Sequence, residues 1–175
     1  MEKVNRFFGM HPEIPLALKI CAGTDGTVTG LLELINGSTI EITTLEQKVI
    51  KPDDRMCRLL DIGRDEDVNY RIVLLTSKET VFGWARSLSP MGRMPMYMKQ
   101  DIMRRDLPIG KILRRYRLET LKDILTIEMT EGTDELRELF GEIPFLSRTY
   151  TISNREVVLL WINEIFPVDD RWIPE

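Results

Sequence analysis

The sequence has 175 residues, of which 43% are hydrophobic and 30% are charged. We therefore expect a single folded domain over residues 1–175, and this composition excludes disordered and fibrous chains. The formal net charge of −4 gives no general attraction to nucleic acid or to an anionic membrane, so a bound anion must be held by local positive charge.

Cysteine and histidine usage excludes most metal and disulfide chemistry. The two cysteines, Cys21 and Cys57, are too few for the disulfide scaffold of a secreted protein and are not spaced as metal ligands. The single histidine, His11, cannot form a multi-histidine metal site or a Ser-His-Asp triad. The glycines also lack the spacing of a nucleotide-binding loop. We therefore predict neither a metal nor an organic cofactor.

Targeting and membrane signals are also missing from the pattern. Residues 1–5 lack the basic-then-apolar order of a signal peptide, and the longest apolar stretch, residues 157–162, is too short to span a bilayer. With so few cysteines, a reducing compartment is the default. We expect a cytoplasmic protein.

In chain order, the first predicted elements are a helix and a strand. A turn precedes a helix over residues 28–35, and Asn36-Gly37 ends that helix. Residues 38–44 alternate polar and β-branched side chains, which is typical of a half-exposed strand. Residues 55–66 show no clear pattern.

The clearest prediction is a β-hairpin formed by residues 68–76 and 81–88, with a short polar turn between them. With the turn centred between Lys78 and Glu79, antiparallel pairing sets three pairs of residues opposite each other on one face. These pairs are Leu75 with Phe82, Val73 with Trp84, and Arg71 with Arg86.

Two arginines would then lie together at one end of an apolar wall. Like charges directly opposite each other destabilise a sheet by roughly 0.2–1 kcal/mol when exposed, and by more when buried, unless an anion lies between them. One interpretation is an internal salt bridge, for example from Arg71 to Asp67, or a strand end in solvent. The other is a ligand carboxylate, which an arginine can bind through two parallel hydrogen bonds.

Residues 91–98 are dense in methionine and predict a loop that leads into a helix over residues 99–105. This stretch fits either a movable cover over a pocket or ordinary core packing. A second short helix begins near Pro108, with Ile109 among its inward-facing residues.

Five arginines surround this second helix, and we interpret them as a solvated face rather than a nucleic-acid surface, since Tyr116 is the one aromatic residue between them. They are Arg104, Arg105, Arg114, Arg115 and Arg117.

The last predicted elements are a strand over residues 121–129, a helix over residues 134–140 and a closing hairpin. In the second strand of that hairpin, residues 157–166, alternation sets Glu164 on the same face as Leu160 and Ile162, unless a bulge intervenes. A carboxylate on that face needs a partner. A strand-end glutamate in water or in a salt bridge is the simpler interpretation, and a pocket residue is the alternative.

Five segments in this order resemble the chorismate pyruvate-lyase family and its archaeal and mycobacterial relatives. The segments are residues 25–29 with Glu33, 70–75, 84–90, 107–113 and 163–166. The resemblance implies an α+β fold in which an antiparallel sheet and short helical flaps enclose a buried ligand pocket. It also implies cleavage of chorismate into 4-hydroxybenzoate and pyruvate without a metal or organic cofactor.

The resemblance also implies roles for individual residues. Arg71 matches the arginine that binds the aromatic carboxylate, and Glu164 matches the glutamate at the phenol end. Val28 and Ile109 match flap residues that line the ring. The best-known bacterial enzymes of the family have Met at the position of Val28 and Leu at the position of Ile109. We therefore predict Arg71 and Glu164 as catalytic residues.

The predicted substrate-binding residues include these four and two more. Thr29 belongs to the first matching segment, and Arg86 is assigned to the enolpyruvyl carboxylate or to ligand access. The residues are Val28, Thr29, Arg71, Arg86, Ile109 and Glu164.

Three alternatives stay open at this point. The ligand could be a related ring carboxylate. The chain could be a non-catalytic sensor like the effector domains of GntR-type repressors, although the roughly two dozen residues before Asp25 are too few for their winged-helix segment. The basic cluster could serve an interaction module. We expect a small aromatic carboxylate as partner, no nucleic acid and no membrane, and the sequence does not indicate the oligomeric state.

Overall fold

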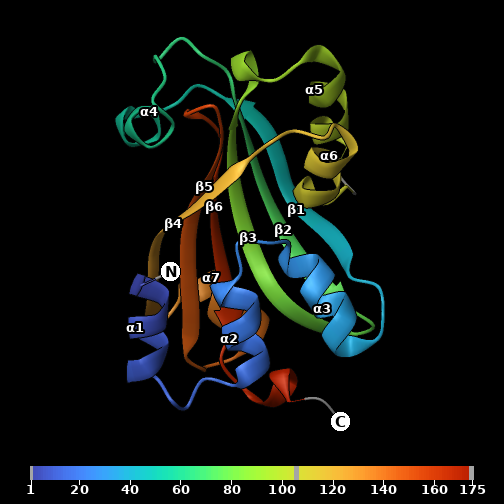
Figure 1. Ribbon diagram of the computed structural model, residues 1–175, viewed down its shortest axis with the longest axis vertical. Helices are drawn as coiled ribbons and strands as arrows, with labels where there is room; N and C mark the ends of the chain where they lie inside the picture. The colour runs from blue at the N-terminus through green and yellow to red at the C-terminus, as the bar shows by residue number, and fades with distance from the viewer. Residues whose placement is uncertain (1, 105–106, 174–175) are drawn as a thin grey trace.

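The computed structural model describes residues 2–104 and 107–173. Its centre is a six-stranded antiparallel sheet with the strand order β1-β2-β3-β6-β5-β4 (Figure 1). The strands are β1 (Glu41–Ile50), β2 (Val68–Ser77), β3 (Thr80–Pro90), β4 (Leu121–Thr130), β5 (Phe145–Asn154) and β6 (Val157–Pro167). The protein is therefore an α+β fold built on an antiparallel sheet, as predicted.

Helices cover both faces of the sheet. They are α1 (Glu2–Met10), α2 (Leu16–Gly23), α3 (Val28–Asn36), α4 (Asp54–Leu60), α5 (Met96–Met103), α6 (Ile109–Arg115) and α7 (Asp134–Phe140). Two of these helices begin with side-chain caps, because Asp53 accepts a hydrogen bond from the Met56 backbone and Thr133 accepts one from the Leu136 backbone. None of the helices in the described part of the chain is long and apolar enough to cross a membrane.

The order of elements repeats. The series α3-β1-α4-β2-β3 is followed by α6-β4-α7-β5-β6, and each series contains strands of 10, 10 and 11 residues. β3 and β6 pair with each other at the middle of the sheet. The two halves are thus related by an approximate two-fold axis through this central pair.

One face of the sheet, which we call the cavity face, is covered at its two ends by separate groups of helices. At one end, α1, α2 and α3 bury an apolar cluster against the sheet that includes Leu18, Leu32 and Phe166. At the other end, α5 and α6 pack through Met98 and Ile112 on β5 and β6. Figure 1 shows the two groups separated, with the start of β4 crossing in front of the sheet between them.

The opposite face is covered by α4 and α7. Leu60 of α4 packs with Leu88 and Trp161, and Leu136 of α7 packs with Trp84. The side chains that pack here alternate along each strand with those that point to the cavity face, as strand geometry requires.

The predicted register of the first hairpin is wrong. The turn lies where it was predicted, since Ser77 pairs with Thr80 and Lys78 has a left-handed φ of 54°. One step further along the strands the register shifts, so that Leu75 pairs with Gly83 and Phe82 becomes an extra residue in β3. A β-bulge of one residue moves every following side chain to the other face.

The bulge separates the two arginines. Arg71 lies opposite Ser87, and Arg86 lies opposite Ile72. Since neighbouring residues of a strand point to opposite faces, Arg71 and Arg86 are on different sides of the sheet.

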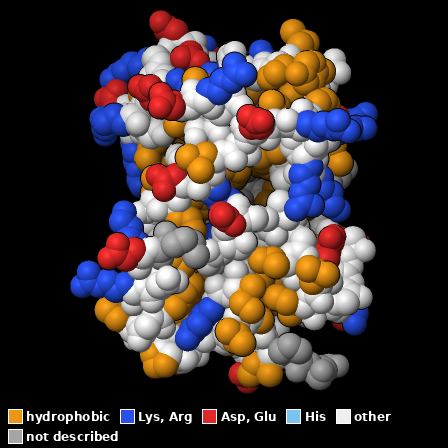
Figure 2. Space-filling model, in the orientation of Figure 1, with side chains coloured by type: hydrophobic (Ala, Val, Ile, Leu, Met, Phe, Trp, Pro, Cys, Tyr) orange, Lys and Arg blue, Asp and Glu red, His pale blue; other side chains and the backbone are white. Residues whose placement is uncertain are grey.

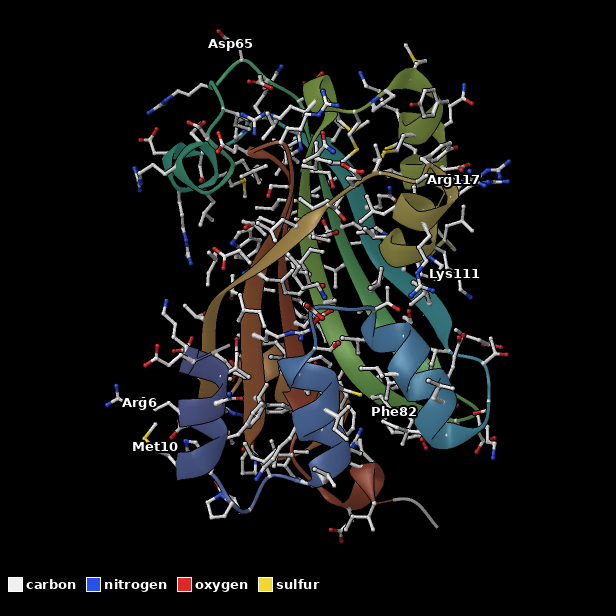
Figure 3. The ribbon with its side chains drawn as sticks, viewed as in Figure 1. Arg6, Met10, Asp65, Phe82, Lys111 and Arg117 are labelled. Atoms are coloured by element: carbon white, nitrogen blue, oxygen red, sulfur yellow. The ribbon has the colours of Figure 1, made fainter. Side chains whose placement is uncertain are left out.

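Packing of the aromatic side chains explains the bulge. Phe82 is 6% exposed and stacks edge-on against Trp172, with 5.4 Å between the ring centroids. Beside it, a Cβ atom on Gly83 would lie 3.0 Å from the ring of Phe166. Glycine therefore lets β3 approach Phe166 closely while Phe82 enters the core (Figure 3).

Several other elements differ from the predictions. Helices α1 and α2 occupy a stretch for which the sequence predicted no element, and α4 occupies part of the stretch without a clear pattern. β1 starts three residues later than predicted and extends to Ile50. α5 starts at Met96, inside the predicted loop. Arg105 lies outside the described residues.

Candidate functional site

A cavity of about 540 Å³ opens on the cavity face between the α3 end and the α6 end. Figure 2 shows this side of the molecule hollowed near its middle. The volume is in the range of small-molecule sites. Its walls come from α3 and the loop before it, from all six strands, and from α6 with the segment that follows it.

Arg71 forms part of the cavity wall from β2 and is 2% exposed. Its guanidinium donates to the carbonyl oxygen of Leu107 at 3.0 Å and to Oγ1 of Thr44 at 3.2 Å. Leu107 lies two residues before α6, so Arg71 contacts both the cavity and the segment that leads into α6. Asp67, considered above as an internal partner, instead pairs with Lys51 at 2.8 Å.

Glu164 lines the same cavity from β6 and is 6% exposed. Its Oε2 accepts hydrogen bonds from Nε of Arg148 at 3.0 Å and from a terminal nitrogen of that arginine at 2.5 Å. Its Oε1 accepts from the hydroxyl of Tyr150 at 2.9 Å. The carboxylate is therefore held in a fixed orientation by two neighbours on β5.

Arg148 is fully buried and connects Glu164 to the end of α2. One guanidinium nitrogen donates to the carbonyl oxygens of Cys21, Ala22 and Thr24 at 3.2, 2.8 and 3.0 Å. These carbonyls lie at the C-terminus of a helix, where the partial charge is negative and a cation is stabilised. Burial alone would lower the pKa of Arg148, but Glu164 and Tyr150 raise it above its usual value.

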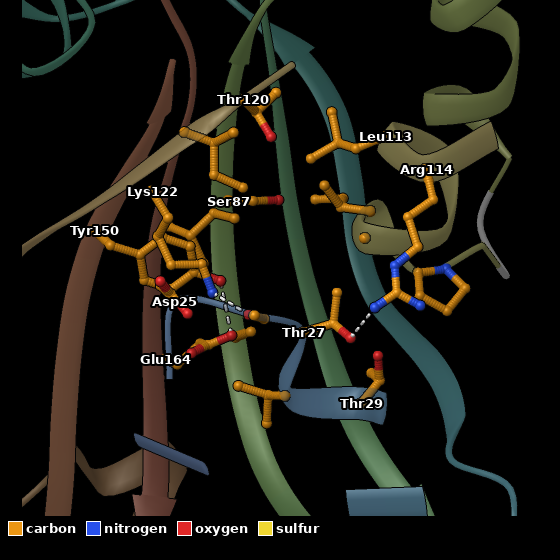
Figure 4. A pocket seen from close by; sticks show the side chains of 18 of the residues that line it. Asp25, Thr27, Thr29, Ser87, Leu113, Arg114, Thr120, Lys122, Tyr150 and Glu164 are labelled. Carbon is orange, nitrogen blue, oxygen red and sulfur yellow. Dashed lines mark hydrogen bonds between the residues drawn. The ribbon is translucent and has the colours of Figure 1, made fainter. Parts of the chain in front are cut away.

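Lys122 of β4 contributes a second cation to the same end of the cavity. Its Nζ donates to the carbonyl oxygen of Gly26 at 2.6 Å and lies 4.4 Å from the centre of the Tyr150 ring. Burial and the neighbouring Arg148 charge lower the pKa of Lys122 to about 8. Figure 4 shows Lys122, Tyr150, Glu164 and Asp25 grouped together.

Burial also affects the other ionisable groups near Glu164. It raises the pKa of Tyr150 well above 10, with Glu164 adding to the effect. It raises the pKa of the Cys21 thiol to about 11. Both groups are therefore neutral at physiological pH, and the tyrosine acts as a hydrogen-bond donor.

Helices α3 and α6, with the residues that lead into them, form two covers that meet over the cavity. Arg114 of α6 donates to Oγ1 of Thr27, which precedes α3, at 3.2 Å (Figure 4). A Cβ atom on Gly110 would lie 2.7 Å from the Thr27 methyl group. Glycine at this position therefore permits the close approach of the two helix starts.

Five of the six predicted substrate-binding residues line this cavity, and Arg86 is not among its lining residues. Val28, Thr29, Arg71, Ile109 and Glu164 come together there from four different elements, α3, β2, α6 and β6. The first residues of α3 and α6, Val28 and Ile109, occupy equivalent places in the two halves of the molecule.

Arg86 lies on the opposite face. Its guanidinium carbon is 5.9 Å from the centre of the Trp84 ring and 5.6 Å from that of Trp161. This is a cation–π arrangement between two largely buried indoles. The sequence argument that brought Arg86 to the ligand fails because it depended on the unbulged register.

Sequence reasoning missed several lining or supporting residues. Arg148, Tyr150 and Ile152 alternate along one strand, and this period-two pattern was the available signal for a second charged position on the cavity face. Lys122 and Ser87 carried no signal of their own, because their position depends on which strands become neighbours.

The basic cluster around α6 divides between the cavity rim and ion pairs with α5. Arg115 pairs with Asp101 of α5 at 2.9 Å, and the Tyr116 hydroxyl donates to the same carboxylate at 2.7 Å. Arg114 and Arg117 are exposed and line the cavity mouth. Figure 3 shows Arg117 and Lys111 pointing outward at this edge.

The arrangement suits a small, flat anion. One wall carries a buried arginine, the other a fixed carboxylate beside a lysine, and apolar side chains lie between them. Among the described residues, no group of three or more His, Cys, Asp or Glu side chains is arranged to hold a metal ion.

Comparisons with known proteins identify the family. A family model described as Chorismate pyruvate-lyase Rv2949c-like matches residues 23–173. A curated protein of Methanocaldococcus jannaschii, named "Putative lyase MJ0807", is 32% identical over 180 residues, which cover 98% of this chain and 86% of that protein.

Solved structures share the fold at low sequence identity. The effector domain of PhnF from Mycobacterium smegmatis has a TM-score of 0.69 and 13% identity, and the match covers 82% of this chain and 90% of that domain. The longer PhnF structure gives a TM-score of 0.67 at 13% identity over 81% of this chain, which spans only 64% of that chain. The C-terminal domain of the histidine utilization repressor from Pseudomonas syringae pv. tomato has a TM-score of 0.59 and 14% identity. The match covers 73% of this chain and 91% of that domain.

These structural matches establish the fold alone, whereas the family model spans most of the chain. The protein belongs to the Rv2949c-like chorismate pyruvate-lyase family.

Proposed function

We propose that this protein is a lyase that converts chorismate into 4-hydroxybenzoate and pyruvate. The observation that carries the proposal is the placement of Arg71 and Glu164 in one cavity, on one face of the sheet. They are two strands and two residues apart, which corresponds to about 12 Å between their Cα atoms from standard sheet spacings. With both side chains directed inward, this span fits a benzene ring that carries a carboxylate and a hydroxyl at opposite ends.

The reaction requires no external oxidant or reductant. The ether bond between the ring and the enolpyruvyl oxygen breaks, and its electron pair leaves with that oxygen. The neighbouring ring carbon, which carries the hydroxyl, loses its hydrogen as a proton, and the ring becomes aromatic. The departing enolate of pyruvate takes up one proton at its methylene carbon, so atoms and charge balance.

Each residue has a role in this scheme. Arg71 binds the ring carboxylate through charge-assisted hydrogen bonds. Glu164 accepts a hydrogen bond from the ring hydroxyl, or moves the proton, through the lone pair of Oε1 that Tyr150 does not use. Val28, Thr29 and Ile109 close over the ring and exclude water, so that the protein holds one productive conformation.

The test is to incubate the purified protein with chorismate in the presence of EDTA and to measure pyruvate and 4-hydroxybenzoate in equal amounts. We expect Arg71→Ala and Glu164→Gln each to lower kcat/KM by about 100-fold or more, as for loss of a buried charge-assisted contact in the transition state. Arg86→Met is the matched arginine control and should retain activity, because Arg86 lies on the opposite face. Product formation no faster than without protein would refute the proposal.

A second candidate function is a non-catalytic sensor of aromatic acids. The shared fold with the effector domain of PhnF and with the histidine utilization repressor domain favours it. Micromolar binding of 4-hydroxybenzoate that depends on Arg71, with no turnover of chorismate, would support the sensor over the lyase.

A further inference from the structure

We propose that Lys122 binds a second carboxylate of the ligand and makes the cavity selective for aromatic dicarboxylates over monocarboxylates. This inference rests on the proposed function, because chorismate carries a second carboxylate on its enolpyruvyl arm. It replaces the role that the sequence argument had given to Arg86.

Lys122 is placed by a strand and held by two neighbours. It is half-buried on β4, its Nζ donates to the Gly26 carbonyl oxygen at 2.6 Å, and it lies over the Tyr150 ring at 4.4 Å. An ammonium group has three N–H donors. The Gly26 bond is the one hydrogen bond that it makes within the described ranges 2–104 and 107–173.

Among the charged groups at the Glu164 end of the cavity, Lys122 is the cation best placed to bind a ligand carboxylate. Arg148 and Glu164 neutralise each other through two hydrogen bonds. Asp25 also faces Lys122, but it is exposed, so water and salt screen its charge more strongly. A carboxylate that reaches the half-buried ammonium therefore gains more than one at the exposed rim.

The other cations of the cavity fit this role less well. Arg114 and Arg117 are exposed and belong to α6 and the segment after it. Arg114 also donates to Thr27. Lys122 belongs to a strand of the sheet, and its hydrogen bond to Gly26 holds it against the loop before α3.

The position of Tyr150 connects Lys122 to the hydroxyl end of the ligand. The tyrosine hydroxyl donates to Glu164 at 2.9 Å, and the face of the same ring carries Lys122. In chorismate the enolpyruvyl arm is attached to the ring carbon next to the one that carries the hydroxyl. With the hydroxyl at Glu164, the arm leaves the ring at the end where Lys122 lies.

The test compares two non-reacting ligands that differ in one carboxylate arm. These probes are 4-hydroxybenzoate and 3-carboxymethoxy-4-hydroxybenzoate, and their affinities are measured by titration calorimetry. We expect Lys122→Met to weaken binding of the dicarboxylate by about 10- to 100-fold, the range of one charge-assisted contact. Binding of 4-hydroxybenzoate should change by less than about threefold.

Two further variants make the result specific. Lys48→Met is the matched control, because Lys48 lies over Tyr70 at 5.3 Å on β1 and does not line the cavity. It should leave both affinities unchanged. Lys122→Gln retains a polar side chain and should show the same selective loss as Lys122→Met, with thermal unfolding confirming that both variants fold.

The proposal is overturned if the Lys122 variants weaken both probes equally, or if Arg114→Met rather than Lys122→Met removes the preference for the dicarboxylate. Failure of the lyase proposal gives a different result, in which chorismate yields no pyruvate while the Lys122-dependent preference between the two probes persists.

Discussion

At the residue scale, the buried charged groups of the site have separate roles. Arg148 and Glu164 form a closed pair whose cost of desolvation is offset by hydrogen bonds to three carbonyls and a tyrosine. The pair holds Glu164 rigid and ties the end of α2 to the sheet. Lys122 lies beside this pair but is not hydrogen-bonded to it. The affinity for a ligand that contacts Lys122 should therefore change as Lys122 titrates.

We expect affinity for an aromatic dicarboxylate to fall as the pH rises through about 8, the pKa of Lys122. Below this pH the ammonium is charged and binds the arm; above it the amine is neutral and the gain is lost. Tyr150 and Cys21 have raised pKa values and stay neutral through this range. Glu164, Arg148 and exposed Asp25 complete the charged groups that act on Lys122. Bound carboxylate moves the midpoint upward, because it favours the charged ammonium.

The measurement is the dissociation constant of 3-carboxymethoxy-4-hydroxybenzoate from about pH 6.5 to about pH 9.5, on either side of this pKa. Lys122→Arg should remove the decline, since arginine stays protonated over the whole range. A decline of equal size for 4-hydroxybenzoate would assign it to another group.

At the element scale, the two covers depend on one close contact between helix starts. Gly110→Ala should prevent full closure, because the new methyl group would meet the Thr27 methyl group at 2.7 Å. We expect weaker ligand binding and faster release, by about 10-fold, with little change in thermal stability. The readouts are the dissociation rate of 4-hydroxybenzoate by stopped-flow fluorescence and KM for chorismate.

The compensating variant tests whether the clash itself is the cause. Thr27→Ser removes the methyl group and keeps the hydroxyl that accepts from Arg114. The double variant Gly110→Ala with Thr27→Ser should therefore recover most of the lost affinity. If the double variant binds as poorly as Gly110→Ala alone, the effect arises from the helix and not from the contact between covers.

Elements were predictable from the sequence where the signal is local. The helix from Asp134 to Phe140 has a capping threonine, and the structure confirms its bounds. The β2–β3 turn was also correct, but the bulge at Phe82 depends on packing against Trp172, which is 90 residues away in the chain. Arg86 was therefore misplaced, while Arg71, on the strand before the turn, keeps the predicted face.

At the scale of the whole molecule, the two halves place the same kind of residue at equivalent points. Arg71 is the fourth residue of β2, and Arg148 is the fourth residue of β5. Each lies opposite the eighth residue of the next strand, which is Ser87 in the first half and Glu164 in the second. An arginine opposite a serine and an arginine opposite a glutamate thus occupy equivalent positions in the two halves, and Arg71, Ser87 and Glu164 line the cavity.

This asymmetry gives the cavity its polarity. In the second half the acid neutralises its arginine and presents a carboxylate to the ligand. In the first half Ser87, an uncharged hydroxyl, occupies the equivalent position opposite Arg71, so β3 adds no carboxylate beside the proposed site of the ligand carboxylate. The sequence showed Arg71 and Glu164 singly, but the equivalence of Ser87 with Glu164 follows only from strand pairing.

Ser87→Glu should therefore convert the first half to the pattern of the second. A carboxylate opposite Arg71 would form the same cross-strand pair as Arg148 and Glu164, and it would repel the ligand carboxylate. We expect the affinity for 4-hydroxybenzoate to fall by about 100-fold, which corresponds to about 2.8 kcal/mol. Ser87→Gln is the control of equal size without charge, and it should lose less than about tenfold. Calorimetric titration measures both affinities, and thermal unfolding should show both variants folded, since Glu164 is accommodated at the equivalent point with 6% exposure. Equal losses for the two variants would show that side-chain volume, and not the sign of the charge opposite Arg71, sets the affinity of this corner.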